Sequence, residues 1–132
     1  MKFFKKSKYK NKKVWYDGIQ FDSIHEKDRY VELLLLQRAG EIKDLKLQVP
    51  FVLIPAQYER IETGEFYKIG IKKGLPKTKE VCVEQSCVYY ADFTYKKDGR
   101  LVVEDAKGVK TDEYVIKRKL MLKNFGIKIV EV

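Results

Sequence analysis

The sequence lacks any long apolar run, and it contains little cysteine, histidine or proline. The apolar stretch over residues 31–36 is already interrupted by Glu32, whereas a membrane-spanning helix needs roughly 18 or more consecutive apolar residues. The N-terminal segment also lacks the apolar region and the small-residue cleavage site of a secretory signal. We therefore expect a cytoplasmic protein that has no membrane partner.

The scarcity of cysteine and histidine limits the metal chemistry that the chain could perform. Cys82 and Cys87 are the only cysteines, and His25 is the only histidine. A structural zinc site needs about four such ligands at characteristic spacings, so the usual kind of zinc site is excluded. We interpret the two cysteines as reduced residues of strands. Because His25 has no carboxylate or thiol partner at the spacing of a catalytic triad, we expect it on the surface at a helix start.

Positive charge is in clear excess. The chain has 28 Lys and Arg against 19 Asp and Glu, which gives a formal net charge of +9. This balance favours a polyanionic partner, with DNA as the leading candidate and RNA as an alternative that charge does not exclude. Seven lysines fall within residues 1–13, which we interpret as a flexible basic arm that either contacts DNA or is simply solvated. Residues 14–132 are enough for a single domain with one core.

Hydrophobic periodicity and end signals predict a mixture of helices and strands. Ser23 and Glu26 match a capping box at the start of a helix expected over residues 24–39. Asp98-Gly99 lies between two β-prone runs, which is a strong hairpin signal. The predicted order is a helix, several antiparallel strands, a second helix and a last strand that enters the sheet in parallel. The other expected elements are a strand over 47–54, a turn at 63–64 leading into a strand over 66–71, a basic loop over 72–77, a helix over 111–125 and a strand over 127–132.

The Asp98-Gly99 hairpin predicts which acidic residues meet. A two-residue loop fixes the register, and counting outward from it places Asp92 opposite Asp105. Directly opposed residues have Cβ atoms only about 4.5–5.5 Å apart, and like charges at that separation are destabilising. A divalent cation such as Mg²⁺, which prefers carboxylate oxygens and phosphate, would make the arrangement favourable. If the turn had three residues, the two acids would be diagonal neighbours, still within reach of one ion.

Lys107 completes a candidate catalytic cluster. Side chains alternate along a strand, so Asp105 and Lys107 point the same way. In phosphodiester hydrolysis, Asp92 and Asp105 would hold the metal, and Lys107 would position water or stabilise developing negative charge. The alternative interpretation is a salt bridge on a solvent-facing sheet. The aromatic residues Tyr89, Tyr90 and Tyr95 of the same hairpin are expected to pack within the sheet.

These residues also carry a resemblance to a known group of nucleases. Asp92, followed by Asp105-Ala106-Lys107-Gly108 and then a helix, resembles the PD-(D/E)xK (restriction-endonuclease-like) superfamily. More closely, the chain is similar to small phage and prophage proteins whose relatives include resolvase-like nucleases and the endonuclease subunit of certain transposases. The sequence departs from the motif at Ala91, where proline is usual, and in having Asp105 rather than glutamate. The segments that carry this closer similarity are 21–26, 90–93 and 103–108, together with Lys117.

The resemblance implies a fold, an activity and two further site residues. The implied fold is an α/β (α+β) restriction-endonuclease-like αβββαβ core, with a central mixed sheet flanked by helices. The implied activity is Mg²⁺-dependent DNA cleavage, with Mn²⁺ able to substitute, branched DNA such as a Holliday junction as one candidate substrate and a homodimer as one candidate assembly. Glu26 would be a third metal ligand, although its capping role explains it equally well. Lys117 would face the site or be solvated.

A hypothesis of another class stays open beside the nuclease. The chain could be a DNA-binding or partner-binding module that retains a nuclease fold without activity. Metal binding would discriminate between the two hypotheses, because only the enzyme requires it.

Overall fold

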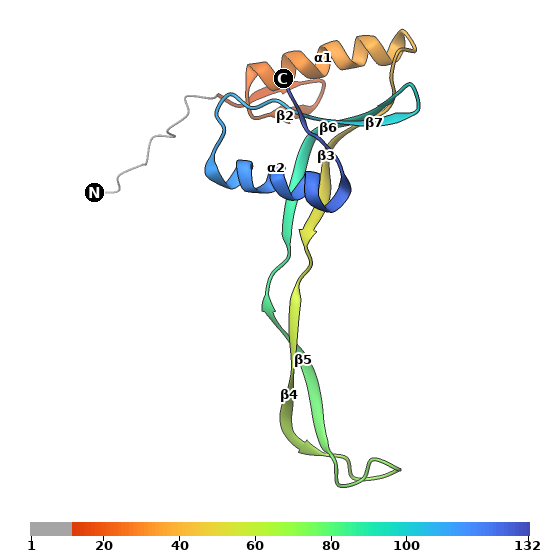
Figure 1. Cartoon of the computed structure of the whole chain (residues 1–132), viewed down its shortest axis with the longest axis vertical. Helices are drawn as coiled ribbons and strands as arrows, with labels where there is room; N and C mark the ends of the chain where they lie inside the picture. The colour runs from red at the N-terminus through yellow and green to blue at the C-terminus, as the bar shows by residue number, and fades with distance from the viewer. Residues whose placement is uncertain (1–11) are drawn as a thin grey trace, which may run out of the picture. The chain divides into compact units, whose positions relative to one another are not determined.

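The structure is a computed structural model that describes residues 12–132. The expected basic arm, residues 1–13, therefore lies almost wholly outside the described residues. Figure 1 shows the arrangement of the elements along the chain. These are β1 (Val14–Tyr16), β2 (Ile19–Phe21), α1 (Ile24–Arg38), β3 (Lys43–Ile54), β4 (Gln57–Phe66), β5 (Pro76–Glu84), β6 (Cys87–Lys97), β7 (Arg100–Asp105), α2 (Asp112–Phe125) and β8 (Val130–Glu131).

The chain divides into two compact units. The first, which we call the core unit, comprises the described residues up to Phe51 together with Tyr89–Val132. The second, which we call the hairpin unit, comprises Val52–Val88. Each unit is described by itself below. Among the described residues, no helix is both long enough and apolar enough to span a membrane.

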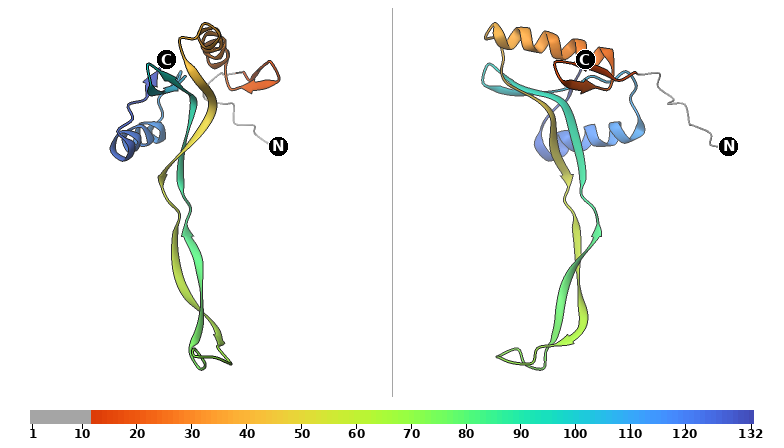
Figure 2. Two further views of the ribbon diagram at one scale, coloured as in Figure 1. Left: turned by 90° about the vertical axis from the view of Figure 1, so that its right-hand side faces the viewer. Right: turned by 180° about the vertical axis from the view of Figure 1, so that it is seen from behind.

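A mixed sheet with a helix on each side forms the centre of the core unit. The strand order is β3-β6-β7-β8, with β6 and β7 antiparallel and β7 and β8 parallel. Helices α1 and α2 lie on opposite sides of these strands (Figure 2). The expected mixed sheet flanked by helices is thus confirmed, including the parallel entry of the last strand. That strand is shorter than expected, since β8 covers only Val130–Glu131.

Both helices lie within one residue of their predicted bounds. Ser23 is the N-cap of α1, and its side chain accepts a hydrogen bond of 3.1 Å from the Glu26 amide. Thr111 caps α2 in the same way by accepting from the Tyr114 amide. Gly126 ends α2 in the left-handed conformation with φ 66°, which a glycine adopts without steric cost. These ends place Glu26 and Lys117 on helices, as expected.

A cluster of buried rings fastens α1 to the sheet. The rings of Tyr30 on α1 and Phe93 on β6 are stacked with their centroids 6.4 Å apart, and Phe21 packs on Tyr30 at 5.1 Å. Leu33 and Phe93 are fully buried, and burying a side chain of this size stabilises the fold by roughly 1.5–3 kcal/mol. This packing holds the first turn of α1, with Glu26, against the strands that carry the two aspartates.

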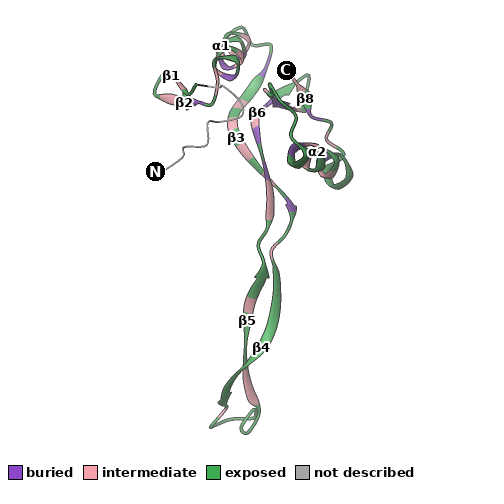
Figure 3. Cartoon of the chain, turned by 90° about the vertical axis from the view of Figure 1, so that its left-hand side faces the viewer, coloured by how far each residue is buried: buried purple, intermediate pink, exposed green. Residues whose placement is uncertain are grey.

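The hairpin unit consists mainly of the antiparallel pair β4 and β5. Strand β4 continues through Gly64 to Phe66, which pairs with Pro76, so the tip of the hairpin is the loop 67–75. The expected turn at 63–64 and strand over 66–71 are therefore wrong. Gly64 has a φ of 84° and lies where the register shifts, because a glycine in a bulge gives the same sequence signal as a glycine in a turn. Strand β4 is exposed throughout, and β5 has three half-buried residues and no buried one (Figure 3).

Candidate active site

Asp92 and Asp105 come together at the end of the β6–β7 ladder. The predicted hairpin register is confirmed from Lys97 opposite Arg100 through Phe93 opposite Glu104. The two aspartates follow directly beyond that last pair. The Asp92 carboxylate also accepts a hydrogen bond of 2.9 Å from the backbone amide of Ala106, which anchors the acid of β6 to the chain just after β7.

The carboxylate of Asp105 is buried and only partly compensated. Its Oδ2 accepts a hydrogen bond from the hydroxyl of Tyr89. Its Oδ1 is buried and has no hydrogen-bond partner, and the ammonium of Lys107 lies 3.7 Å away. That distance allows electrostatic attraction but exceeds a hydrogen bond. Because Asp105 is fully buried, the salt bridge on a solvent-facing sheet is not the correct description of this cluster.

The two carboxylates interact electrostatically. Burial, and then the charge of Asp92, raise the pKa of Asp105 to about 6, while the Tyr89 hydrogen bond and the Lys107 charge oppose the increase. Burial and the hydrogen bond to Asp105 also raise the pKa of the Tyr89 hydroxyl, which keeps it protonated as a donor. The hydrogen bond from Tyr89 and the charge of Lys107 therefore do not fully offset the free-energy cost of keeping Asp105 ionised here.

Glu26 extends this acidic environment from α1. Its side chain is only 6% exposed. Its Oε2 accepts from the Asp22 amide at 3.4 Å, one residue before the position of a standard capping box. Burial, followed by the charges of Asp92 and Asp22, raises its pKa to about 7. Glu26 thus takes part in the helix start and shares the electrostatic field of the aspartates, so both roles considered from the sequence fit its position.

Gln48 is a site residue that the sequence reasoning missed. Its side-chain amide donates to Asp92 Oδ1 at 3.1 Å and to Glu26 Oε1 at 3.3 Å, which links the two acids. Its backbone has a φ of 50°, a conformation that is uncommon for residues other than glycine and that is often found at functional sites. The only signal in the sequence was a polar residue between Leu47 and Val49 in an otherwise apolar strand.

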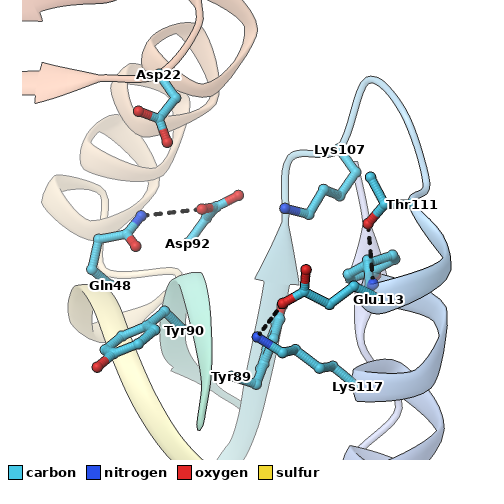
Figure 4. A pocket seen from close by; sticks show the side chains of 10 residues that line it. Asp22, Gln48, Tyr89, Tyr90, Asp92, Lys107, Thr111, Glu113 and Lys117 are labelled. Atoms are coloured by element: carbon cyan, nitrogen blue, oxygen red, sulfur yellow. Dashed lines mark hydrogen bonds and ion pairs between the residues drawn. The ribbon is translucent and has the colours of Figure 1, made fainter. Parts of the chain in front are cut away.

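Gln48, Asp92 and Lys107 line a pocket with a volume of about 300 Å³, whereas Glu26 and Asp105 are not among its lining residues. Figure 4 shows the Lys107 ammonium pointing toward Asp92 across it, with Lys117 contributed by α2. Lys117 is paired with Glu113 at 3.1 Å, and Lys107 also lies over the Tyr114 ring at 5.4 Å. An adjoining hollow of about 210 Å³ contains Glu26 and shares Asp92 and Lys107. The lining of the larger pocket is Asp22, Gln48, Tyr89, Tyr90, Asp92, Lys107, Thr111, Glu113, Tyr114 and Lys117.

The donor set can be compared with the needs of a hard divalent cation. Within residues 12–132, no three His, Cys, Asp or Glu side chains already converge as a group that could hold a metal ion. The pair of aspartates nevertheless offers carboxylate oxygens in an electronegative setting, and Asp105 Oδ1 is a buried acceptor without a hydrogen bond. Mg²⁺ is commonly held by only one or two carboxylates plus water and substrate phosphate. The carboxylates of Asp92 and Asp105 have the chemistry that such a site needs, and Glu26 lies in the adjoining hollow.

Other polar residues have structural partners. Arg29 forms a two-pronged ion pair with the fully buried Glu104 at 2.7 and 2.8 Å, and the hydroxyl of Tyr95 donates to the same carboxylate. His25 donates from Nε2 to the carbonyl of Val132 at 2.8 Å. The expectation that the three tyrosines simply pack in the sheet is therefore incomplete. Tyr89 and Tyr95 are donors to buried acids, and Tyr90 is 57% exposed and lines the pocket.

A comparison with models of protein families identifies the family to which the chain belongs. A model of the family described as "Protein of unknown function (DUF1064)" matches residues 6–130. The chain belongs to this family. No curated protein and no solved structure matches it. The DUF1064 match extends over both units, so the acidic site and the β4–β5 hairpin both belong to the part of the chain that defines the family.

Proposed function

We propose that this DUF1064 protein is a metal-dependent endonuclease that hydrolyses phosphodiester bonds of DNA at the pocket beside Asp92 and Asp105. The observation that carries the proposal is the buried Asp105 Oδ1, which has no hydrogen bond and lies next to a second carboxylate. Like charges held together in a buried place are stabilised by a cation. A basic residue, Lys107, faces the same space.

The proposed roles follow from the positions of the side chains. Asp92 and Asp105 would hold the metal, with Glu26 as a further ligand. When bound, Mg²⁺ would polarise the phosphate and acidify a water molecule. The Lys107 ammonium would bind a phosphate oxygen and stabilise negative charge as it develops. Lys117 could turn toward a phosphate as well, because its pairing with the exposed Glu113 is a surface ion pair of low energy.

The choice of DNA rests on charge and on the resemblance to PD-(D/E)xK nucleases. A net charge of +9 attracts polyanions and releases their counterions. The resemblance to resolvase-like phage proteins supports branched DNA as a substrate and a homodimer as the acting form. Both of these finer statements are part of the proposal.

The proposal is tested by incubating the protein with Mg²⁺ or Mn²⁺ and linear, supercoiled and four-way-junction DNA, with RNA in parallel. We expect DNA cleavage that EDTA abolishes. Asp92→Asn should reduce the rate at least about a thousandfold, since the metal supplies several kcal/mol of transition-state stabilisation and about 1.4 kcal/mol is worth a factor of ten. Asp98→Asn is the matched control, because it makes the same chemical change in the turn, where asparagine is equally suited.

Two outcomes would contradict the proposal. Failure to cut any of these substrates, combined with no Mg²⁺ or Mn²⁺ binding in calorimetric titration with DNA present, would favour a DNA-binding module without activity. Equal loss of cutting in Asp92→Asn and Asp98→Asn would show that the reaction does not depend on the aspartate pair.

A further inference from the structure

Charge is sorted by position along the β4–β5 hairpin. The part of the hairpin away from its loop, residues 57–65 and 80–84, carries five glutamates and a single arginine, Arg60. Arg60 itself pairs with Glu80 at 3.3 Å. Residues 66–79, which we call the basic tip, carry five lysines and no acid. The hairpin therefore concentrates five lysines at one end, and the nearest acids, Glu62, Glu65 and Glu80, lie just beyond it. A merely solubilising surface would have both signs interspersed.

The basic tip has a defined backbone. The Tyr67 amide donates to the Leu75 carbonyl at 3.0 Å, and the Gly74 amide donates back to the Tyr67 carbonyl at 2.9 Å. The half-buried Tyr67 ring is approached by the ammonium groups of Lys72 and Lys77, at 5.6 and 5.5 Å from its centroid. The lysines thus stand on a closed loop whose shape is set by its own hydrogen bonds.

Two aliphatic side chains project from this loop into solvent. Ile69 is 85% exposed and Ile71 is 105% exposed. Their exposure is greater than that of any other large hydrophobic residue described in residues 12–132. Burying a side chain of this size is ordinarily favourable. Two highly exposed isoleucines among lysines therefore indicate a contact surface for a partner that is both anionic and able to cover apolar groups.

We propose that the basic tip binds duplex DNA, with its lysines on backbone phosphates and Ile69 and Ile71 placed against the groove as apolar wedges. The inference rests on the proposed function for its choice of DNA as the polyanion, and it adds how that DNA is held. Proteins that engage the minor groove combine basic residues with inserted Ile, Leu, Met or Phe side chains. The tip has this combination, and its five lysines face no acidic neighbour within residues 66–79.

Other anionic partners fit the tip less well. Single-stranded nucleic acid is usually bound by a series of exposed aromatic platforms, whereas the basic tip has one exposed ring, Phe66 at 57%, and its second ring, Tyr67, is half-buried and flanked by two lysines. An anionic membrane would have to be held through two isoleucines. These contain fewer carbons than a single myristoyl chain, which by itself gives only marginal membrane binding.

The test measures DNA binding in EDTA, so that no cleavage or metal ligand is involved. Fluorescence anisotropy with a duplex of about 30 base pairs, recorded over a range of salt concentrations, is compared between the full chain and two variants. Lys68→Glu/Lys73→Glu should weaken binding about tenfold or more and reduce the slope of log K against log salt by about 1.8, since each phosphate contact contributes roughly 0.9. Ile69→Ser/Ile71→Ser should weaken binding about tenfold without changing this slope, because apolar contacts release no counterions.

The matched control makes the same charge change in the core unit. Lys43 and Lys97 are exposed there, and Lys43→Glu/Lys97→Glu should leave the salt slope nearly unchanged. All the substituted side chains are exposed, and circular dichroism verifies that each variant folds. An equal effect of the two lysine variants would overturn the inference. So would a tip-dependent loss of affinity for single-stranded DNA or for phosphatidylserine vesicles that leaves duplex binding intact.

The two proposals can fail separately. Tip-dependent duplex binding in a protein that never cuts DNA would uphold the basic tip and contradict the nuclease. Cleavage with unchanged binding by both tip variants would uphold the nuclease and contradict the basic tip.

Discussion

The core unit and the hairpin unit use charged residues in opposite ways. In the core unit, Glu26, Glu104 and Asp105 are all buried, and each is defined by particular neighbours. In the hairpin unit, the strand residues of β4 are all exposed, and charges are sorted along the chain, with Arg60 and Glu80 forming an exposed ion pair. Burial strengthens the interaction between neighbouring charges, and catalytic sites depend on such strengthened interactions. An exposed row of like charges instead suits an extended polyanion.

Within the core unit, the neighbouring buried acids Glu104 and Asp105 differ in how many hydrogen bonds their carboxylates accept. Glu104 accepts two hydrogen bonds from Arg29 and one from Tyr95. Asp105 accepts one from Tyr89 and has an Oδ1 without a hydrogen bond. Both are fully buried, so the difference lies in compensation. A fully compensated buried acid holds elements together, whereas an undercompensated one is a candidate for a functional role, here the proposed binding of a cation.

The largest expected effect is the loss of DNA cleavage when Asp105 is changed. Asp105→Asn should reduce the cleavage rate by a factor of at least about a thousand, since it removes a proposed metal ligand. The same change should raise the stability of the metal-free protein at pH 8, because it removes a buried charge that lacks full compensation. Cleavage assays and urea unfolding measure the two effects. An Asp105→Asn protein that cuts DNA normally would contradict the assignment.

The next largest effect is the loss of folding stability when Glu104 is changed. Glu104→Gln should destabilise the fold by roughly 3–5 kcal/mol, because it leaves Arg29 without its buried partner. The combined variant Arg29→Met/Glu104→Leu should recover most of that loss, since an apolar pair carries no desolvation penalty. Urea unfolding gives the free energies. If Glu104→Gln were as stable as the natural chain, the ion pair would not be what fastens α1 to β7.

The pH dependence of stability gives a smaller effect with a defined sign. The pKa of Glu26 rises to about 7 in the folded protein from an ordinary value of 4.5, so folding favours its protonated form. This contribution is fully present below about pH 4.5 and is lost as the pH rises through 7. One pKa unit is worth about 1.4 kcal/mol, so Glu26 should account for about 3 kcal/mol of lost stability in the metal-free protein.

Thermal or urea unfolding between pH 5 and 8 measures this loss. Glu26→Gln should make the loss of stability with pH smaller, because glutamine does not titrate, and the remaining loss should come from Asp105 through its own raised pKa of about 6. A stability that rises with pH over this range, in the absence of divalent metal, would contradict the burial of uncompensated acids in the core unit.

The smallest effect is expected in the hairpin unit. Arg60 and Glu80 form an ion pair at 3.3 Å with both side chains well exposed, at 66% and 60%. Exposed pairs contribute roughly 0–1 kcal/mol, so Arg60→Ala should change the free energy of unfolding by less than about 1 kcal/mol. Urea unfolding would detect a larger change, which would mean that charge in the hairpin is held as firmly as in the core unit.

The sequence by itself predicted the features whose causes lie within a few residues. The Ser23 cap marks the start of α1 correctly, and the expected helix over 111–125 differs from α2 by one residue, because helix ends are set by backbone groups of their own turn. Asp98-Gly99 fixed the β6–β7 register, because a two-residue loop leaves only one pairing. From that register came the approach of Asp92 to Asp105.

Only the tertiary structure decided how these groups are surrounded. The link from Gln48 to Glu26 and Asp92, and the pairing of Arg29 with Glu104, join residues 22 to 75 positions apart. The hairpin turn was misplaced because Gly64 can serve a bulge as well as a turn. Periodicity reports which face of an element is apolar, but burial and compensation depend on which distant elements cover it. The sequence therefore determined which acids meet, and the packing of α1 and α2 on the sheet decided that Asp105 is buried with an oxygen left unbonded.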